Sequence, residues 1–130
     1  CGQVNCIESF ISGSGLERQY MNHTAQHADV PHIMQRVESG DADACLLWER
    51  YCDQLARALA GVVNTLDPDV IVLGGGVSNI TLLYSGLQAR VAQYVFGKQC
   101  RTPIVQARHG DSSGVRGAAW LGAQKASVNQ

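Results

Sequence analysis

Two cysteines and a glycine lie close together at the start of the chain, in the stretch CGQVNCIE. Cys1 and Cys6 are five residues apart around a glycine-containing turn. Thiolates on a tight loop can supply half of a tetrahedral zinc site, and the other ligands must then come from elsewhere. Cys1 and Cys6 are therefore candidate zinc ligands that do not close a site by themselves.

His23 and His27 are the obvious further donors within the chain. Their i, i+4 spacing predicts that both lie on one face of a helix, where they could complete such a site. The alternative is a pair of surface histidines on a polar segment, which their surroundings favour. Cys45 and Cys52 fall on a long predicted helix and are expected to be core thiols.

Glu8 follows Cys6 by two residues, at the start of a predicted helix. A carboxylate in this position is favoured by the positive end of the helix dipole. It could also accept hydrogen bonds from the hydroxyls of a ligand. From the residues alone, the first interpretation is the stronger.

Three consecutive glycines, Gly74, Gly75 and Gly76, follow a short apolar run in DVIVLGGGVSN. Glycine permits positive φ and leaves the backbone open to close approach. If a helix follows, its first amides could meet a phosphate or the edge of a nucleotide, with Ser78 or Asn79 as the cap. The alternative is a tight turn packed against a neighbouring element, because the spacing matches neither the phosphate loop nor the dinucleotide fingerprint.

Helical patterns dominate the elements that must position these residues. A short helical turn near the start breaks at Gly13 and Gly15 and then resumes, and a second helix carries Pro31 early and precedes Gly40. The longest helix is predicted over about 43–66, and Pro68 ends it. Its apolar face is expected to comprise Leu47, Tyr51, Leu55, Leu59, Val62 and Leu66.

After this helix the pattern becomes strand, helix, strand, helix. VIVL predicts a buried strand, residues 80–96 a helix, TPIVQARH a second strand, and the last helix begins near Ser112. A right-handed crossover would make the two strands parallel neighbours. Two strands make a small sheet, and the chain begins with Cys1, so we expect an upstream segment to supply further strands.

The composition is that of one globular domain, with 45% hydrophobic residues, 16% charged residues and a net charge of −1. This balance favours neither a nucleic-acid nor a membrane partner. The five cysteines show no regular disulfide spacing, which favours a reducing, cytoplasmic setting.

Three stretches in one order resemble the carboxy-terminal half of the ROK family of sugar kinases: CGQVNCIESFISGSGL, DPDVIVLGGGVSN and HGDSSGVRGAAWLGA. The resemblance covers essentially the whole chain and is strongest to bacterial fructokinases (mannokinases) and to N-acetylglucosamine kinases. It implies that residues 1–130 are the carboxy-terminal part of a kinase. The implied fold is the helix-rich α/β portion of an actin/hexokinase-like (ribonuclease H-like) ATPase domain, with two short parallel strands.

The resemblance also implies roles for the candidate residues. Cys1 and Cys6 match the second and third cysteines of a structural zinc site made by one histidine and three cysteines, whose other ligands would lie upstream. Asn5 stands where the family pattern has glycine, and asparagine also tolerates a left-handed backbone. Glu8 matches a glutamate that contacts sugar hydroxyls. Gly74, Gly75 and Gly76 match the segment near the adenosine of ATP.

The implied reaction is transfer of the γ-phosphate of ATP to a hexose hydroxyl, with magnesium and with fructose as the expected sugar. The general base would lie upstream, so we expect these 130 residues alone to be inactive. Relatives are often dimers, so a homodimer is expected. The alternative is the sugar-sensing part of a ROK-family transcriptional repressor, which has no need of an ATP segment.

Overall fold

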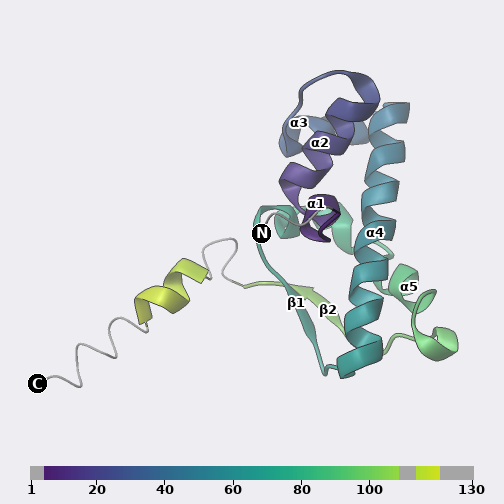
Figure 1. Ribbon diagram of the computed structural model, residues 1–130, viewed down its shortest axis with the longest axis vertical. Coiled ribbons are helices and arrows are strands. Elements are labelled where there is room, and N and C mark those ends of the chain that lie inside the picture. Colours follow the sequence, from purple (N-terminus) through teal and green to yellow (C-terminus); the bar gives the residue numbers. More distant parts are fainter. Residues whose placement is uncertain (1–4, 109–113, 121–130) are drawn as a thin grey trace, which may run out of the picture.

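The computed structural model describes residues 5–108 and 114–120 (Figure 1). Four α-helices come first: α1 (Glu8–Ile11), α2 (Gly13–Thr24), α3 (Val30–Glu38) and α4 (Ala42–Leu66). The strand β1 (Ile71–Leu73) is followed by 3-10 turns at Gly76–Asn79 and Thr81–Tyr84, by α5 (Leu87–Ala92), by a turn at Phe96–Lys98 and by β2 (Ile104–Gln106). Residues 114–120 are helical.

Side-chain caps explain where the amino-terminal helices begin. The hydroxyl of Ser12 accepts from the Gly15 amide, which starts α2 and separates it from α1. The carboxylates of Asp29 and Asp41 accept from backbone amides in the first turns of α3 and α4. Gly15 lets the first two helices meet closely, because a Cβ there would lie 2.7 Å from the Ser9 carbonyl oxygen.

The long helix α4 is the centre of the packing. It contacts α1, α2, α3 and α5, and Figure 1 shows it running past both the helical end and the sheet end of the molecule. Its rings of Trp48 and Tyr51 stack with centroids 5.4 Å apart. The buried face of α4 comprises Ala44, Leu47, Trp48, Tyr51, Cys52, Leu55, Ala56, Leu59, Ala60 and Val63.

The predicted apolar face of α4 is confirmed except near its end. Val62 and Leu66 are 40% and 71% exposed, whereas Val63 is buried. The buried stripe continues through Val63, four residues after Leu59, which places Val62 and Leu66 on the neighbouring side of the helix.

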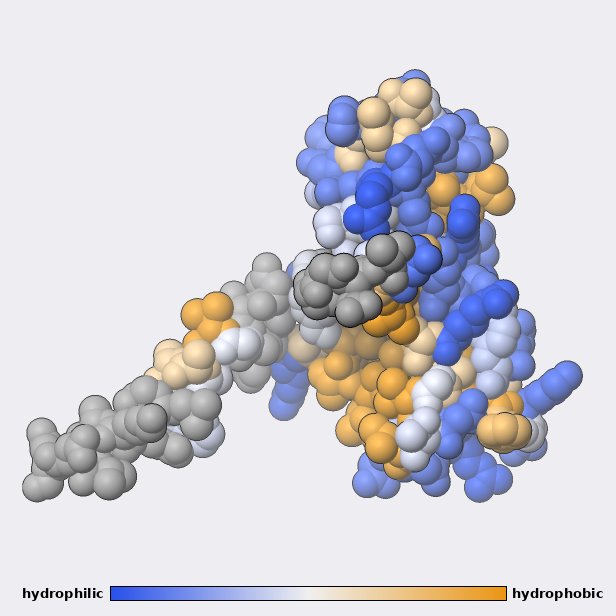
Figure 2. All heavy atoms as spheres, viewed as in Figure 1, coloured by the Kyte–Doolittle hydropathy of each residue, from blue (hydrophilic) through white to orange (hydrophobic). Residues whose placement is uncertain are grey.

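The two predicted strands pair in parallel, as expected. Ile71 lies opposite Ile104, and Leu73 lies opposite Gln106, within a sheet that has two strands among the described residues. Val70, Val72 and Val105 are exposed, and Figure 2 shows apolar side chains gathered over this part of the molecule. The parallel sheet therefore presents apolar side chains to solvent, whereas such sheets are ordinarily covered on both faces.

The helix predicted over residues 80–96 is wrong in its extent. Two 3-10 turns occupy its first part, and α5 is only 6 residues long. Gly86 interrupts the pattern with a φ of 73°, a left-handed conformation that no continuous helix contains. The predicted start of the last helix near Ser112 lies outside the described residues.

Cys52 is confirmed as a core thiol, whereas Cys45 and Cys6 are only partly buried. Burial raises the pKa of Cys52 to about 11, so its thiol stays protonated at neutral pH. We expect iodoacetamide to modify Cys52 far more slowly than Cys100, a partly buried thiol outside the predicted zinc site, because the thiolate is the nucleophile. Peptide mass spectrometry after timed alkylation measures this, and equal rates at the two cysteines would contradict it.

Within the described residues, none of the helices is both long enough and apolar enough to cross a bilayer.

Candidate functional site: the glycine turn and the Glu8 helix

The glycine turn (Gly74–Gly76) leaves β1 with its backbone open to the outside. A Cβ built on any of the three glycines would meet no atom of the described residues within 4 Å. Among the described residues, no neighbouring element packs against this turn, so its backbone is accessible there. Only Gly75 needs to be glycine for its conformation, with φ 87° and ψ 173°, a region that other residues scarcely populate.

Side chains of the following residues hold the glycine turn in this shape. The buried Ser78 donates from its hydroxyl to the Gly75 carbonyl oxygen at 2.6 Å. Tyr84 in turn donates to the Ser78 carbonyl at 2.8 Å, and burial raises the pKa of Tyr84, which keeps its phenol protonated. The Gln106 amide donates to the Asn79 side chain at 3.1 Å, which ties the turn to β2.

The expectation that Ser78 or Asn79 caps a following α-helix is wrong. A 3-10 turn, Gly76–Asn79, begins at the last of the glycines, and neither it nor the next turn has a side-chain cap. The hydroxyl of Ser78 is used to fasten the glycine turn, because it reaches back to the carbonyl three residues earlier.

A pocket of about 640 Å³ lies between the glycine turn and α3, and we call it the glycine-turn pocket. Most of its wall is apolar, which suits the flat face of a base. The α3 side of this wall is a part of the site that sequence reasoning missed, since nothing in VPHIMQRVES marks it as more than an amphipathic helix. The pocket is lined by Gly13, Val30, Pro31, Met34, Glu38, Gly76, Val77, Asn79, Ile80, Thr81 and Leu82.

Glu8 is the first residue of α1, and it is exposed. The α1 helix is anchored beneath it by Tyr51 of α4, whose hydroxyl donates to the Ile11 carbonyl at 2.6 Å. The chain then enters α2 at Gly13, where a Cβ would lie 3.4 Å from side-chain atoms of both Val30 and Val77. The start of α2 therefore connects α1, which carries Glu8, to the wall of the glycine-turn pocket.

The loop before Glu8 leaves the zinc prediction untested. Asn5 has a φ of 60°, the left-handed conformation expected for a position that takes glycine in the ROK pattern. Cys6 is a free, partly buried thiol, and Cys1 lies outside the described residues. In the described part of the chain no three His, Cys, Asp or Glu side chains are grouped to hold a metal, so Cys6 alone does not test the site.

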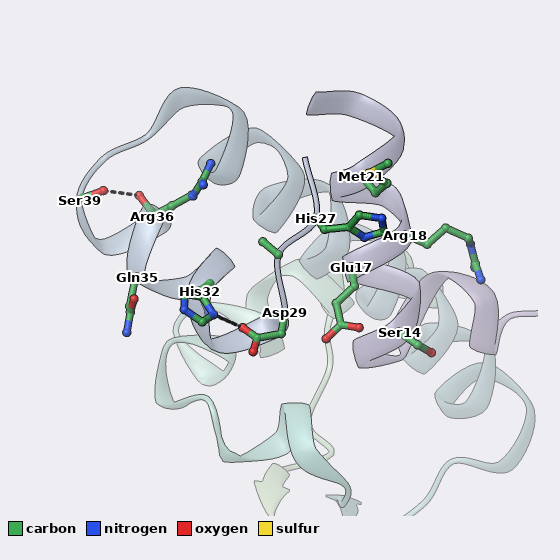
Figure 3. Close-up of a pocket in the computed structure, with 11 residues that line it drawn as sticks. Ser14, Glu17, Arg18, Met21, His27, Asp29, His32, Gln35, Arg36 and Ser39 are labelled. Atoms are coloured by element: carbon green, nitrogen blue, oxygen red, sulfur yellow. Dashed lines mark hydrogen bonds and ion pairs between the residues drawn. The ribbon is translucent and has the colours of Figure 1, made fainter. Parts of the chain in front are cut away.

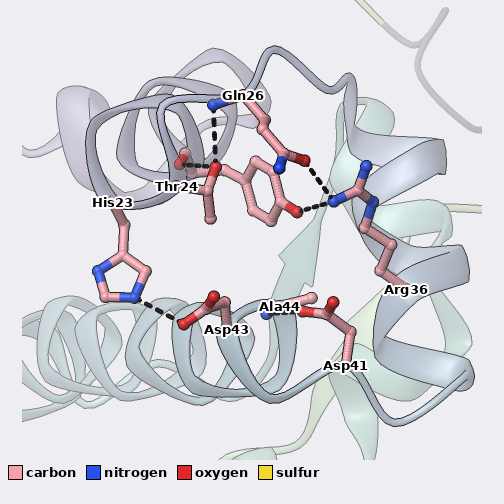
Figure 4. A network of polar contacts seen from close by, with 8 residues as sticks. His23, Thr24, Gln26, Arg36, Asp41, Asp43 and Ala44 are labelled. Carbon is pink, nitrogen blue, oxygen red and sulfur yellow. Dashed lines mark hydrogen bonds and ion pairs between the residues drawn. The ribbon is translucent and has the colours of Figure 1, made fainter.

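His23 and His27 do not share a helix face, so this expectation is wrong. The α2 helix ends at Thr24, and Ala25 adopts a left-handed conformation with φ 58°. His23 binds Asp43 on α4, with 2.9 Å between its Nε2 atom and a carboxylate oxygen (Figure 4). His27 lies beyond the helix and lines a different cavity.

That second cavity, of about 820 Å³, lies between α2 and α3 (Figure 3). Its charged side chains have both signs, and Arg18 and Arg36 point in different directions. Arg36 is already engaged, because it donates to the Tyr20 hydroxyl and to the Gln26 side chain (Figure 4). The two arginines of this cavity therefore do not converge on one point.

Comparisons of this chain with known proteins all indicate the same family. Residues 1–125 match the pattern of the ROK family. N-acetyl-D-glucosamine kinases from Salmonella typhi and Salmonella newport are 40% identical over 121 residues, which is 93% of this chain and 40% of each relative. The chain thus spans about 40% of the length of these curated relatives.

Solved structures share the fold. A ROK hexokinase from Thermus thermophilus superposes with a TM-score of 0.79 at 28% identity, over 96% of this chain and 44% of that protein. A ROK family glucokinase from Streptomyces griseus, solved with glucose and AMPPNP, has a TM-score of 0.79 at 24% identity, over 93% and 45%. The predicted helix-rich, actin/hexokinase-like α/β fold with two parallel strands is thereby confirmed, and the chain belongs to the ROK family.

Proposed function

We propose that residues 1–130 are the carboxy-terminal part of an ATP-dependent sugar kinase. The observation that carries this proposal is the glycine turn, which accepts a hydrogen bond from Ser78, is exposed and borders an apolar pocket. A repressor has no need of such a nucleotide site. The kinase names of the relatives support the same activity.

In this proposal each candidate residue has a defined role. Adenosine lies against the glycine turn, with Gly74, Gly75 and Gly76 giving close access to backbone. Glu8 accepts hydrogen bonds from sugar hydroxyls and orients the sugar for attack on the γ-phosphate. Phosphoryl transfer depends on this positioning and on neutralisation of phosphate charge, for which magnesium is the expected ion.

The preferred sugar in this proposal is N-acetyl-D-glucosamine, because the relatives described above are named N-acetyl-D-glucosamine kinases. The sequence led us to expect fructose, and that substrate remains a candidate to be tested. A site built to hydrogen-bond a sugar can discriminate strongly between related hexoses, because each missing contact leaves a polar group unpaired.

The test is a coupled ADP-release assay on the full-length protein that contains these residues. ATP and magnesium would be supplied with N-acetylglucosamine, fructose, glucose or mannose in turn. Rapid turnover with one sugar is the expected result and would name the substrate. No turnover with any sugar, from folded protein, would contradict the proposal and favour the repressor alternative.

Glu8→Gln should lower kcat/KM for the sugar by about tenfold, because a charge-assisted hydrogen bond to a hydroxyl is replaced by a neutral one. The same ADP assay, run at varied sugar and at varied ATP, measures the effect. The KM for ATP should change little, which separates the role from a general loss of folding. Asp69→Asn, which removes an exposed carboxylate elsewhere, is the control, and equal effects in both variants would contradict the role of Glu8.

Three further properties are part of the proposal. Cys1 and Cys6 would hold a structural zinc ion together with upstream residues, and that ion would rigidify the loop that leads to Glu8. The full-length protein would be a cytoplasmic homodimer. Elemental analysis of the full-length protein tests for the zinc ion, and its mass by light scattering tests for the homodimer.

A further inference from the structure

Glu38 occupies a position where its own helix does not stabilise it. It is the last residue of α3, where the partial negative charge of the helix terminus disfavours a carboxylate. In the part of the chain that the structure describes, no hydrogen bond or ion pair engages its side chain. The neighbouring Ser39 and Gly40 also offer it no cation.

The same carboxylate lies at the edge of the glycine-turn pocket. Among the described residues that line this pocket Glu38 alone is charged. It is exposed, so it belongs to the rim and not to the apolar interior formed by residues such as Met34 and Val77. Asn79, another polar residue of the lining, is already tied to Gln106.

An ionised carboxylate only accepts hydrogen bonds, so its natural partner is a group with two adjacent donors. The ribose of a nucleotide presents such a pair in its 2′- and 3′-hydroxyls, and carboxylates bind ribose in this way in dinucleotide folds. The apolar interior of the glycine-turn pocket suits the base, and the phosphates must extend toward solvent along the open backbone of the glycine turn. The sugar ring between them therefore meets the rim.

We infer that Glu38 binds the ribose 2′,3′-diol of the nucleotide and makes the site selective for ribonucleotides. This inference rests on the proposed function, because it assigns a specificity-determining residue within the same nucleotide site. It adds a contact from α3, across the pocket from the glycine turn.

Direct binding tests this on the full-length protein, by isothermal titration calorimetry with ATP and 2′,3′-dideoxy-ATP. The unmodified protein should prefer ATP by about tenfold, the size expected for hydrogen bonds to a charged group. Glu38→Gln and Glu38→Ala should bring the two affinities within about threefold of each other, mainly by weakening ATP. Asp69→Asn, a charge-matched control outside the pocket lining, should keep the tenfold preference.

The outcomes separate the two proposals. If ATP does not bind the unmodified protein, the proposed function fails and this inference fails with it. If ATP binds but the preference for ATP over dideoxy-ATP survives in both Glu38 variants, the inference alone is overturned. A GTP titration guards against a contact to the base: a change in the ATP-to-GTP ratio with an unchanged ribose preference would also overturn it.

Discussion

Replacing Gly75 by valine should lower kcat/KM for ATP by about 100-fold in the full-length protein. At φ 87° and ψ 173° the backbone of Gly75 lies in a region that is essentially restricted to glycine, and a β-branched residue there costs on the order of 1–3 kcal/mol in strain. The turn would relieve this strain by moving away from its present shape. The hydrogen bonds from Ser78 and Tyr84 that hold it would then be lost as well. Initial rates at varied ATP, with the sugar saturating, measure the effect.

Gly74→Ala is the matched control for this change. Gly74 has no positive φ, and a Cβ there meets no atom within 4 Å, so alanine fits without strain. We expect less than a threefold change in kcat/KM for ATP unless the nucleotide itself touches that Cβ position. If Gly75→Val were as active as Gly74→Ala, the glycine turn would have no part in nucleotide binding.

Tyr51→Ala should destabilise the protein by about 3–5 kcal/mol, the usual cost of truncating a large buried side chain. Tyr51 is 2% exposed, stacks on Trp48 and donates its hydroxyl to the Ile11 carbonyl. Burial raises the pKa of Tyr51 to about 12, so the phenol remains a donor throughout the range of ordinary assays. Chemical denaturation followed by far-UV circular dichroism gives the change in the free energy of unfolding.

Tyr51→Phe separates the hydroxyl from the ring. It keeps the stacking and the packing, and it removes only the hydrogen bond to Ile11, which should cost about 1–2 kcal/mol. Because that bond anchors α1, which begins at Glu8, KM for the sugar should rise more than KM for ATP. A loss of stability equal to that of Tyr51→Ala would mean that the hydroxyl, and not the ring, dominates this part of the core.

The elements with strong periodicity were predictable from the sequence. The predicted helix over 43–66 agrees with Ala42–Leu66, because a long amphipathic pattern bounded by Asp41 and Pro68 leaves little alternative. The segment from Ile80 to Phe96 was mispredicted, because its apolar residues are compatible with a helix while Gly86 imposes a left-handed backbone. A pattern of apolar residues does not report such a local conformation.

The parts of the candidate site that are formed by residues adjacent in the sequence were predictable. The glycine turn and Glu8 stand out in the sequence, and the turn has the open backbone that a ligand requires. The α3 wall could not be foreseen, because Val30 and Met34 reach the pocket only through tertiary packing. The histidine pair failed for a related reason: spacing alone did not reveal that Ala25 ends α2 between His23 and His27.

The 25 residues of α4 give it a length of about 37 Å at 1.5 Å per residue. It contacts α1, which Tyr51 anchors from within the first half of α4, and it also contacts α5. The α5 helix in turn contacts the turn at Thr81–Tyr84 that helps to hold the glycines. The proposed sugar contact and the proposed nucleotide contact are therefore both connected to α4, through the elements that pack against it. If the full-length protein closes a cleft over its substrates, Glu8 and Gly75 should move together as one body. Closure would then change the distance from these residues to the opposite side of the cleft, and it would leave the distance between Glu8 and Gly75 unchanged.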